Sequence, residues 1–310
     1  MFPVAPGLSN PATNGKGSED STRQVSSYEI YAADFGSSPD RVFAAQDQHP
    51  FVGGEFVWSG WDYLGEPTPY YSSRSSYFGI VDLAGFRKNR FYLYQSRWRP
   101  DLPMAHILPH WTWPDRVGKI TPVHVFTSGD EAELFLNGKS LGRKKKLPFE
   151  YRLCWNDVVY QPGALEVIAY KNGVEWASDK VVTADAPAKL ELEADRGRIR
   201  DDGDDLSFVT VTVVDSRGIE NPRAENRIHF AIQGPGEIVA TDNGDATDLE
   251  PFPSHDRNAF HGKCLLIIRS INGREGSIRI TASAQGLADG NAIVRTSADR
   301  EVAPADTQHR

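Results

Sequence analysis

The sequence predicts a mostly β protein in which two β-sandwich domains follow an aromatic region where strands and helices alternate. Short apolar runs separated by turn residues recur from about residue 101 onward, a pattern typical of sandwiches. Two Asn-Gly pairs, at 137–138 and 172–173, follow such runs and indicate two-residue hairpin turns. Before residue 101, an apolar run, an acidic loop and a helix-like stretch follow one another, as in a βα unit.

Residues 1–100 form the aromatic region. The first 27 residues are rich in Gly, Pro, Ser, Thr and Asn and predict a surface loop. Phe56, Val57 and Trp58 are good strand formers, and two glycines and a proline then end the predicted strand. Residues 89–98 predict a short helix. One or two βα units cannot close a core by themselves, so we expect exposed sheet edges here.

The two predicted sandwiches occupy residues 101–185 and 186–298, and both are expected to be immunoglobulin-like. Strands of the first are predicted at 123–127, 133–136 and 165–170, and strands of the second at 190–194, 208–214, 228–232, 264–269 and 277–282. Residues 184–188 predict a linker, and residues 299–310 predict a disordered polar tail.

Composition excludes several classes of partner. A hydrophobic content of 39% and a charged content of 25% are ordinary for a soluble globular protein. No apolar run approaches the length of a membrane span, and the first residues lack the pattern of a signal peptide. A net charge of −8 argues against nucleic acid, and the basic stretch Lys139–Lys145 predicts a solvated strand end. The sequence therefore predicts neither a nucleic-acid nor a membrane partner.

Metal ligands are not predicted. Cys154 and Cys264 lack a neighbouring Cys or His at zinc spacing and are expected to be buried free thiols. The acidic run Asp201–Asp205 lacks the spacing of a calcium loop and predicts a solvated turn. His106 and His110 are four residues apart, but the proline between them argues against a helix that would align both rings.

Residues 54–67 are the most informative stretch of the chain. They place two tryptophans, a tyrosine and three carboxylates in fourteen positions. Flat rings stack on the apolar faces of sugars, and carboxylates accept hydrogen bonds from hydroxyls. The stretch therefore predicts a sugar-binding subsite, with a buried aromatic cluster under a loop as the alternative.

The same stretch resembles a known family. Residues 54–70 (GEFVWSGWDYLGEPTPY), 77–85 (YFGIVDLAG) and 108–113 (LPHWTW) are similar to the C-terminal half of family 2 glycoside hydrolases. More narrowly, they resemble bacterial β-galactosidases that carry two extra β-sandwich domains after the catalytic TIM barrel. The resemblance runs from about Gln24 to Ser297. It implies that residues 1–100 are an incomplete C-terminal part of that barrel, and it suggests a periplasmic or secreted bacterial setting.

The resemblance also implies roles for individual residues. Trp58 would line the subsite that holds the cleaved sugar, with Trp61 as a second stacking platform. Glu55, Asp62 and Glu66 would orient sugar hydroxyls. The implied reaction is retaining hydrolysis of a β-linked glycoside or oligosaccharide by two carboxyls about 5 Å apart, without a metal or organic cofactor.

The sequence departs from the family at the reactive carboxyls. No Asn-Glu pair at a strand end matches the family's acid/base motif. Ser18-Glu19 resembles the nucleophile motif, but the surrounding segments place Glu19 in an inserted loop. We therefore expect the nucleophile to precede Met1 and the chain to lack about six of the eight βα units. Such a chain would be inactive alone and would need the N-terminal half of the enzyme, in cis or in trans.

A second hypothesis is a non-catalytic carbohydrate-binding or scaffolding protein built of sandwiches. It would require tryptophans exposed on a sandwich surface. Trp155 and Trp176 are the candidates, and both are expected to be buried.

Overall fold

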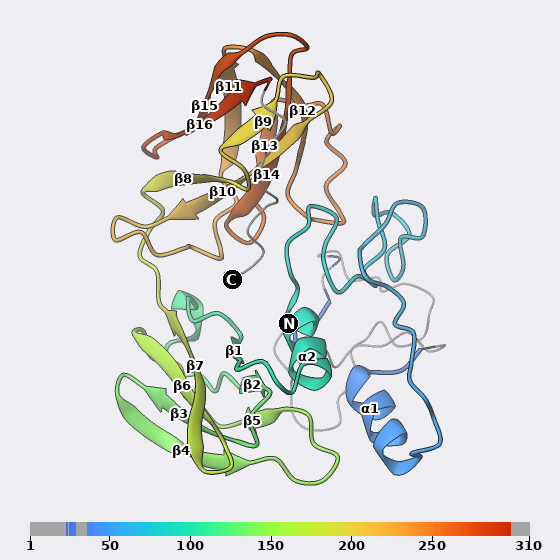
Figure 1. The fold of residues 1–310 in the computed structure, drawn as a ribbon. Helices are drawn as coiled ribbons and strands as arrows, with labels where there is room; N and C mark the ends of the chain where they lie inside the picture. The colour runs from blue at the N-terminus through green and yellow to red at the C-terminus, as the bar shows by residue number, and fades with distance from the viewer. Residues whose placement is uncertain (1–22, 24, 29–35, 299–310) are drawn as a thin grey trace. The chain divides into compact units, whose positions relative to one another are not determined.

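The computed structural model describes residues 23, 25–28 and 36–298 of the 310-residue chain (Figure 1). This part is mostly β, as predicted. The chain divides into two compact units, Met1–Thr183 and Ala184–Arg310. Most of the predicted N-terminal loop and the predicted polar tail lie outside the described residues.

The described part of the first unit contains two α-helices, α1 (Pro39–Gln48) and α2 (Asn89–Trp98). The second coincides with the predicted helix, whereas α1 was not predicted. A proline stands in the first turn of α1, where its missing N–H costs nothing. The helices share a small core in which Phe43 and Leu93 are fully buried and the rings of Phe43 and Tyr94 meet edge to face.

The described residues of this unit also form two antiparallel sheets and one short 3-10 turn (Pro114–Arg116). The three-stranded sheet has the order β1 (Ala105–Leu108), β2 (Val123–Thr127), β5 (Leu153–Trp155). The four-stranded sheet has the order β4 (Lys139–Lys145), β3 (Glu131–Leu136), β6 (Ala164–Lys171), β7 (Val174–Val182). Their shared core is built around Trp111, Trp155 and Tyr160.

Both Asn-Gly hairpins form as predicted. The φ angles are 51° and 77° at 137–138, and 54° and 79° at 172–173. Positive φ at both central positions is what a type I′ turn requires. The basic strand β4 is largely exposed, which confirms the prediction of a solvated strand there.

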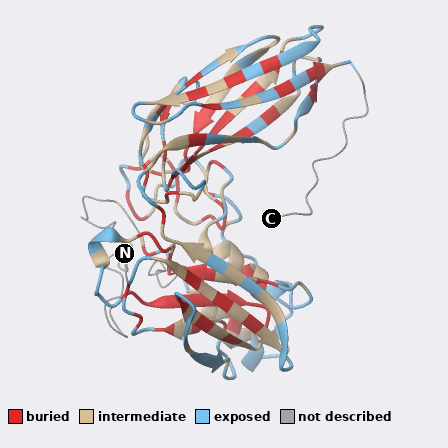
Figure 2. Cartoon of the chain, turned by 90° about the vertical axis from the view of Figure 1, so that its left-hand side faces the viewer, coloured by how far each residue is buried: buried red, intermediate tan, exposed pale blue. Residues whose placement is uncertain are grey.

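The second unit is a sandwich of two sheets. One has the order β12 (Gly236–Asp242), β14 (Lys263–Ser270), β10 (Leu206–Val214), β8 (Lys189–Ala194). The other has the order β13 (Asp256–Asn258), β11 (Arg227–Gln233), β15 (Gly276–Ala284), β16 (Gly290–Ser297), β9 (Arg198–Arg200). Buried and exposed residues alternate along its strands (Figure 2), and the inward-facing side chains form one core.

Three expectations need correction. Residues 56–58 form no strand, because they have no ladder partner within the described residues. Seven of the described strands were missed because they are short, polar or contain glycine and give a weak signal: β1, β5, β7, β9, β12, β13 and β16. Both cysteines are free, but only Cys264 is buried, and Cys154 is partly exposed.

Candidate functional site

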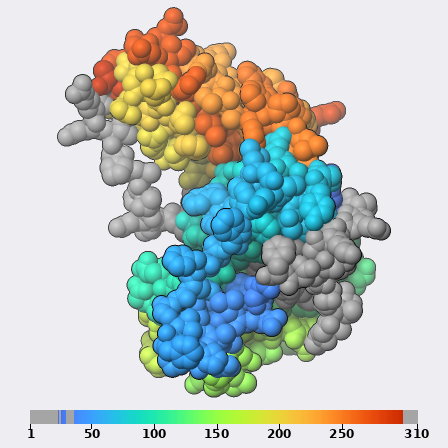
Figure 3. Space-filling model, turned by 90° about the vertical axis from the view of Figure 1, so that its right-hand side faces the viewer, coloured from blue at the N-terminus to red at the C-terminus, as the bar shows by residue number. Residues whose placement is uncertain are grey.

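Three of the four aromatic side chains in residues 54–67 are exposed to solvent. Phe56 is fully exposed, and the exposed fractions of Trp58 and Trp61 are 72% and 61%. Figure 3 shows this part of the chain, in blue, at the surface of the first unit. The alternative of a buried aromatic cluster is therefore wrong for both tryptophans.

The segment is held on one side by a neighbouring stretch of the same unit. Residues 59–62 lie beside residues 78–81, and Trp61 and Val81 form a parallel β-bridge. The amides of Ile80 and Val81 donate to the carbonyls of Ser59 and Gly60, both at 3.0 Å. Within the described part of the chain, this short pairing is the only β-type contact of residues 54–62.

Asp62 fastens that pairing. Its side chain is 3% exposed. One carboxylate oxygen accepts the amide of Gly79 at 2.7 Å, and the other lies 2.5 Å from the ammonium of Lys88. Burial raises the pKa of Asp62, while the charge of Lys88 and the amide of Gly79 oppose that shift. A Cβ on Gly79 would lie 2.1 Å from the amide nitrogen of Asp62, so the two backbones approach as only glycine allows. These contacts give Asp62 a structural role, whereas a hydroxyl ligand would need an oxygen open to solvent.

Trp58, Tyr63 and Glu66 form a hydrogen-bonded chain. The indole N–H of Trp58 donates to the hydroxyl of Tyr63 at 2.9 Å, and this hydroxyl donates to the carboxylate of Glu66. The rings of Trp58 and Tyr63 stand edge to face, 5.9 Å apart at 89°. Desolvation and the bond to Glu66 raise the pKa of Tyr63.

Glu55 lies in a different environment from the other two acids. Its Oε1 is buried and has no hydrogen-bond partner within the described residues. Burial raises the pKa of the Glu55 carboxyl, and the charge of Arg97 opposes that shift. Glu19, the remaining acid considered above, lies outside the described residues.

The histidines and acids considered as metal ligands have other contacts. The ring of His106 stacks on the ring of Tyr92, with 3.8 Å between the ring centroids. The ring of His110 stacks on the ring of Trp113, with 4.1 Å between the centroids. Asp202 accepts the amides of Asp204 and Asp205, as in a closed turn. No group of three or more potential metal ligands occurs among residues 36–298 or the few described before them. The described helices include none long and apolar enough to cross a membrane.

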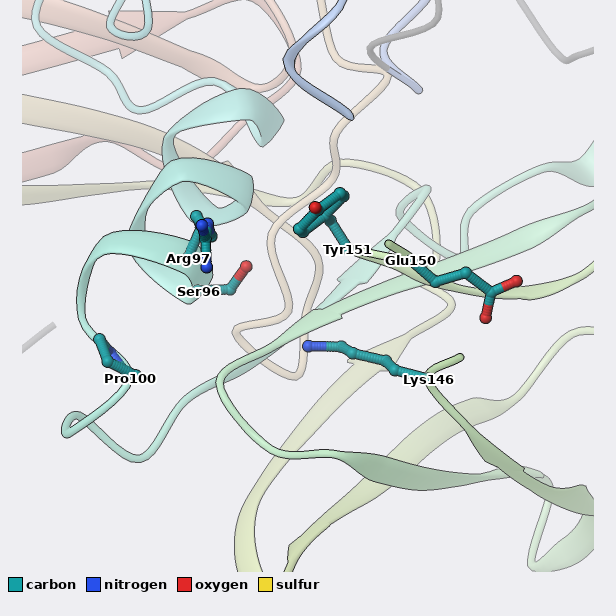
Figure 4. A pocket seen from close by; sticks show the side chains of 6 residues that line it. All are labelled: Ser96, Arg97, Pro100, Lys146, Glu150 and Tyr151. Atoms are coloured by element: carbon teal, nitrogen blue, oxygen red, sulfur yellow. The ribbon is translucent and has the colours of Figure 1, made fainter. Parts of the chain in front are cut away.

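A pocket of about 210 Å³ lies at the end of α2 (Figure 4). Its lining residues are Ser96, Arg97, Pro100, Lys146, Glu150 and Tyr151. Lys146 and Glu150 point in opposite directions there. Arg97 is paired with Asp47, and the Lys146 ammonium donates to the carbonyl of Thr127. Arg97 thus joins α2 to α1, and Lys146 joins the residue after β4 to β2. None of the predicted site residues lines the pocket.

The sandwich tryptophans offer no sugar platform. Trp155 is 1% exposed, in the core of the first unit. Trp176 is partly exposed, which corrects the expectation that it is buried. Its indole N–H donates to Ser128, and the Lys171 ammonium lies over its ring, 4.5 Å from the ring centroid. The residues that sequence reasoning missed are Gly79 and Lys88, which fix Asp62. Nothing in the local sequence signals either contact, because each joins positions far apart along the chain.

Two family profiles match the chain. Residues 190–292 match the profile described as Glycoside hydrolase family 2 C-terminal domain 5. Residues 118–177 match the profile described as Domain of unknown function (DUF4982).

Individual relatives cover most of the chain. It is 42% identical over 281 residues to a β-galactosidase of Bacteroides ovatus, which is 90% of this chain and 32% of that protein. It is 34% identical over 248 residues to a putative β-glucuronidase of Formosa agariphila, covering 76% of this chain and 23% of that protein. The crystal structure of a β-glycosidase from Bacteroides vulgatus matches with a TM-score of 0.82 and 33% identity, over 87% of this chain and 34% of the other.

These relatives define the class: they are glycosidases, as the tryptophan-rich segment indicated. The chain belongs to glycoside hydrolase family 2. It spans about a third of the length of the Bacteroides ovatus and Bacteroides vulgatus relatives. The family resemblance predicted from the sequence is therefore confirmed.

Proposed function

We propose that this chain is the C-terminal part of a retaining glycoside hydrolase that removes terminal β-linked sugars, as β-galactosidases do. The observation that carries the proposal is the 42% identity to the Bacteroides ovatus β-galactosidase over 90% of this chain. The relative named as a putative β-glucuronidase makes glucuronides the competing substrate.

Residues 1–100 are, in this proposal, the end of a TIM barrel, and residues 101–185 and 186–298 are two sandwich domains that follow it. The parallel bridge between Trp61 and Val81 supports the barrel assignment, because neighbouring barrel strands are parallel. The exposed side chains of Phe56, Trp58 and Trp61 also support it, since a complete barrel would give them neighbours.

The sugar would stack on Trp58, with Trp61, Glu55 and Glu66 around it and Asp62 holding the segment in place. The two reactive carboxyls would come from polypeptide joined to this chain in cis or in trans. One would attack the anomeric carbon, and the other would protonate the leaving oxygen and then activate water. In this scheme the chain supplies binding and orientation, and it is inactive alone.

A fusion enzyme tests the proposal. The full chain is joined to the part of the Bacteroides ovatus β-galactosidase that it does not match, and hydrolysis of nitrophenyl β-galactoside and β-glucuronide is measured. We expect turnover by the fusion and none by the chain alone. Trp58→Ala should lower kcat/KM about 30-fold, as loss of a central aromatic contact does.

The control is Trp98→Ala, which removes a half-exposed tryptophan at the end of α2 and should leave kcat/KM unchanged. Turnover by the chain alone that disappears in Glu19→Gln would contradict the proposal. Equal activity of Trp58→Ala and the parent fusion would remove Trp58 from the site.

A further inference from the structure

The hydrogen-bonded chain from Trp58 through Tyr63 to Glu66 has a fixed direction. An indole N–H can only donate and an ionised carboxylate can only accept. The Tyr63 hydroxyl therefore uses its acceptor side for Trp58, at 2.9 Å, and its proton for Glu66. The rings of Trp58 and Tyr63, 5.9 Å apart at 89°, add an edge-to-face contact between the same two residues.

We infer that Glu66 and Tyr63 are positioning residues that set the ring plane of Trp58 before a sugar arrives. This rests on the proposed function, in which Trp58 is the platform of the sugar subsite. The Trp58 side chain is 72% exposed, so no packed core fixes its rotamer. Ordering such a side chain on binding would cost affinity, and a ring that is already ordered avoids that cost.

This inference changes the role of Glu66. The sequence suggested that its carboxylate orients sugar hydroxyls directly, but the structure shows it accepting the proton of Tyr63. A direct ligand and a positioning residue differ in one testable way. The effect of a positioning residue disappears once the group that it positions has been removed, whereas the effect of a direct ligand persists.

The first test uses the full chain without any sugar. Hydrogen exchange of the tryptophan indole N–H groups is measured by NMR, and the Trp58 signal is assigned by its loss in Trp58→Phe. Tyr63→Phe and Glu66→Ala should each speed exchange of the Trp58 indole about 3- to 10-fold, the effect of losing one hydrogen bond. The matched controls, Tyr71→Phe and Glu175→Ala, alter exposed residues and should leave it unchanged. Unchanged exchange in Tyr63→Phe and Glu66→Ala would overturn the inference.

The second test uses the fusion enzyme. Tyr63→Phe and Glu66→Ala should lower kcat/KM about 3- to 10-fold, and Glu66→Ala should have no further effect in a Trp58→Ala background. A full additional loss in that background would overturn the inference and make Glu66 a direct ligand. Faster indole exchange combined with full activity of Trp58→Ala would support the positioning of the ring and reject the proposed function instead.

Discussion

Many apolar side chains are buried in the second sandwich, whereas several in residues 51–71 are exposed to solvent. In the sandwich, Val211, Phe230 and Ile278 are completely buried, and they come from strands of both sheets. In residues 51–71, Phe56 and Trp58 lie mostly in solvent. Both regions are rich in strand-forming residues, so local preference does not separate them.

The difference lies in where each region finds its neighbours. The sandwich has all nine strands of its two sheets within residues 189–297, so its own sequence closes its core. Residues 59–62 have one short neighbour, residues 78–81. A contiguous exposed apolar patch on a soluble protein marks a binding surface. Residues 51–71 thus expose apolar side chains that the described chain does not cover, as the proposed function requires.

The largest expected effect is on stability. Phe230→Ala should lower the free energy of unfolding of the second unit by about 3–5 kcal/mol, because it empties a fully buried position. Phe56→Ala should change the stability of the first unit by about 0.5 kcal/mol or less, since that ring has no contacts to lose. Urea unfolding followed by circular dichroism measures both.

Of these two variants, Phe56→Ala tests whether the aromatic segment is open to solvent. A loss of about 2 kcal/mol or more would show that the ring packs against its own chain in solution. The contrast between a closed sandwich and an open aromatic segment would then be wrong.

A slightly smaller effect is expected from pH on the free energy of unfolding of the first unit, through His106. Burial lowers the pKa of His106 to about 4. Below the ordinary histidine value of about 6.5 the unfolded chain gains a proton that the folded unit does not bind until about pH 4. The folded state is therefore fully stabilised above pH 6.5 and loses on the order of 3 kcal/mol as pH falls through that window.

His106→Phe tests this directly, because a phenyl ring can keep the stack on Tyr92 without titrating. Unfolding free energies at several pH values should fall less steeply for the variant between pH 6.5 and 4. Because burial also lowers the pKa of His124, to about 3, part of the dependence should remain. Identical slopes for the variant and the parent would contradict the lowered pKa of His106.

The sequence predicted features that depend on neighbours along the chain. The helix at 89–98 and the turns at 137–138 and 172–173 formed because periodicity and positive φ are local properties. The prediction of a strand at 56–58 was wrong, because a strand needs a paired strand from another part of the chain. The candidate site shows the same contrast between local and long-range features. Composition and family resemblance identified Trp58 as a candidate sugar-binding residue. The contacts of Asp62 with Gly79 and Lys88 could not be predicted, because they form only in the folded chain.

The smallest effect concerns the pairing of residues 59–62 with residues 78–81, which Asp62 holds together. Asp62→Asn keeps the shape of the side chain but removes its charge, so Lys88 loses its ion pair and the amide of Gly79 a charged acceptor. The local cost should be about 1–2 kcal/mol. The amides of Ile80 and Val81, which donate to Ser59 and Gly60, should then exchange with deuterium about 5- to 30-fold faster.

Two reference points make this measurement informative. The amide of Phe230 in the sandwich should exchange at its original rate, and Glu66→Gln should leave Ile80 and Val81 unchanged because Glu66 contacts Tyr63 instead. If Asp62→Asn left the exchange of Ile80 and Val81 unaltered but abolished hydrolysis by the fusion enzyme, Asp62 would be a sugar ligand, as the family resemblance implied. The opposite result would show that the buried carboxylate of Asp62 holds residues 59–62 against residues 78–81.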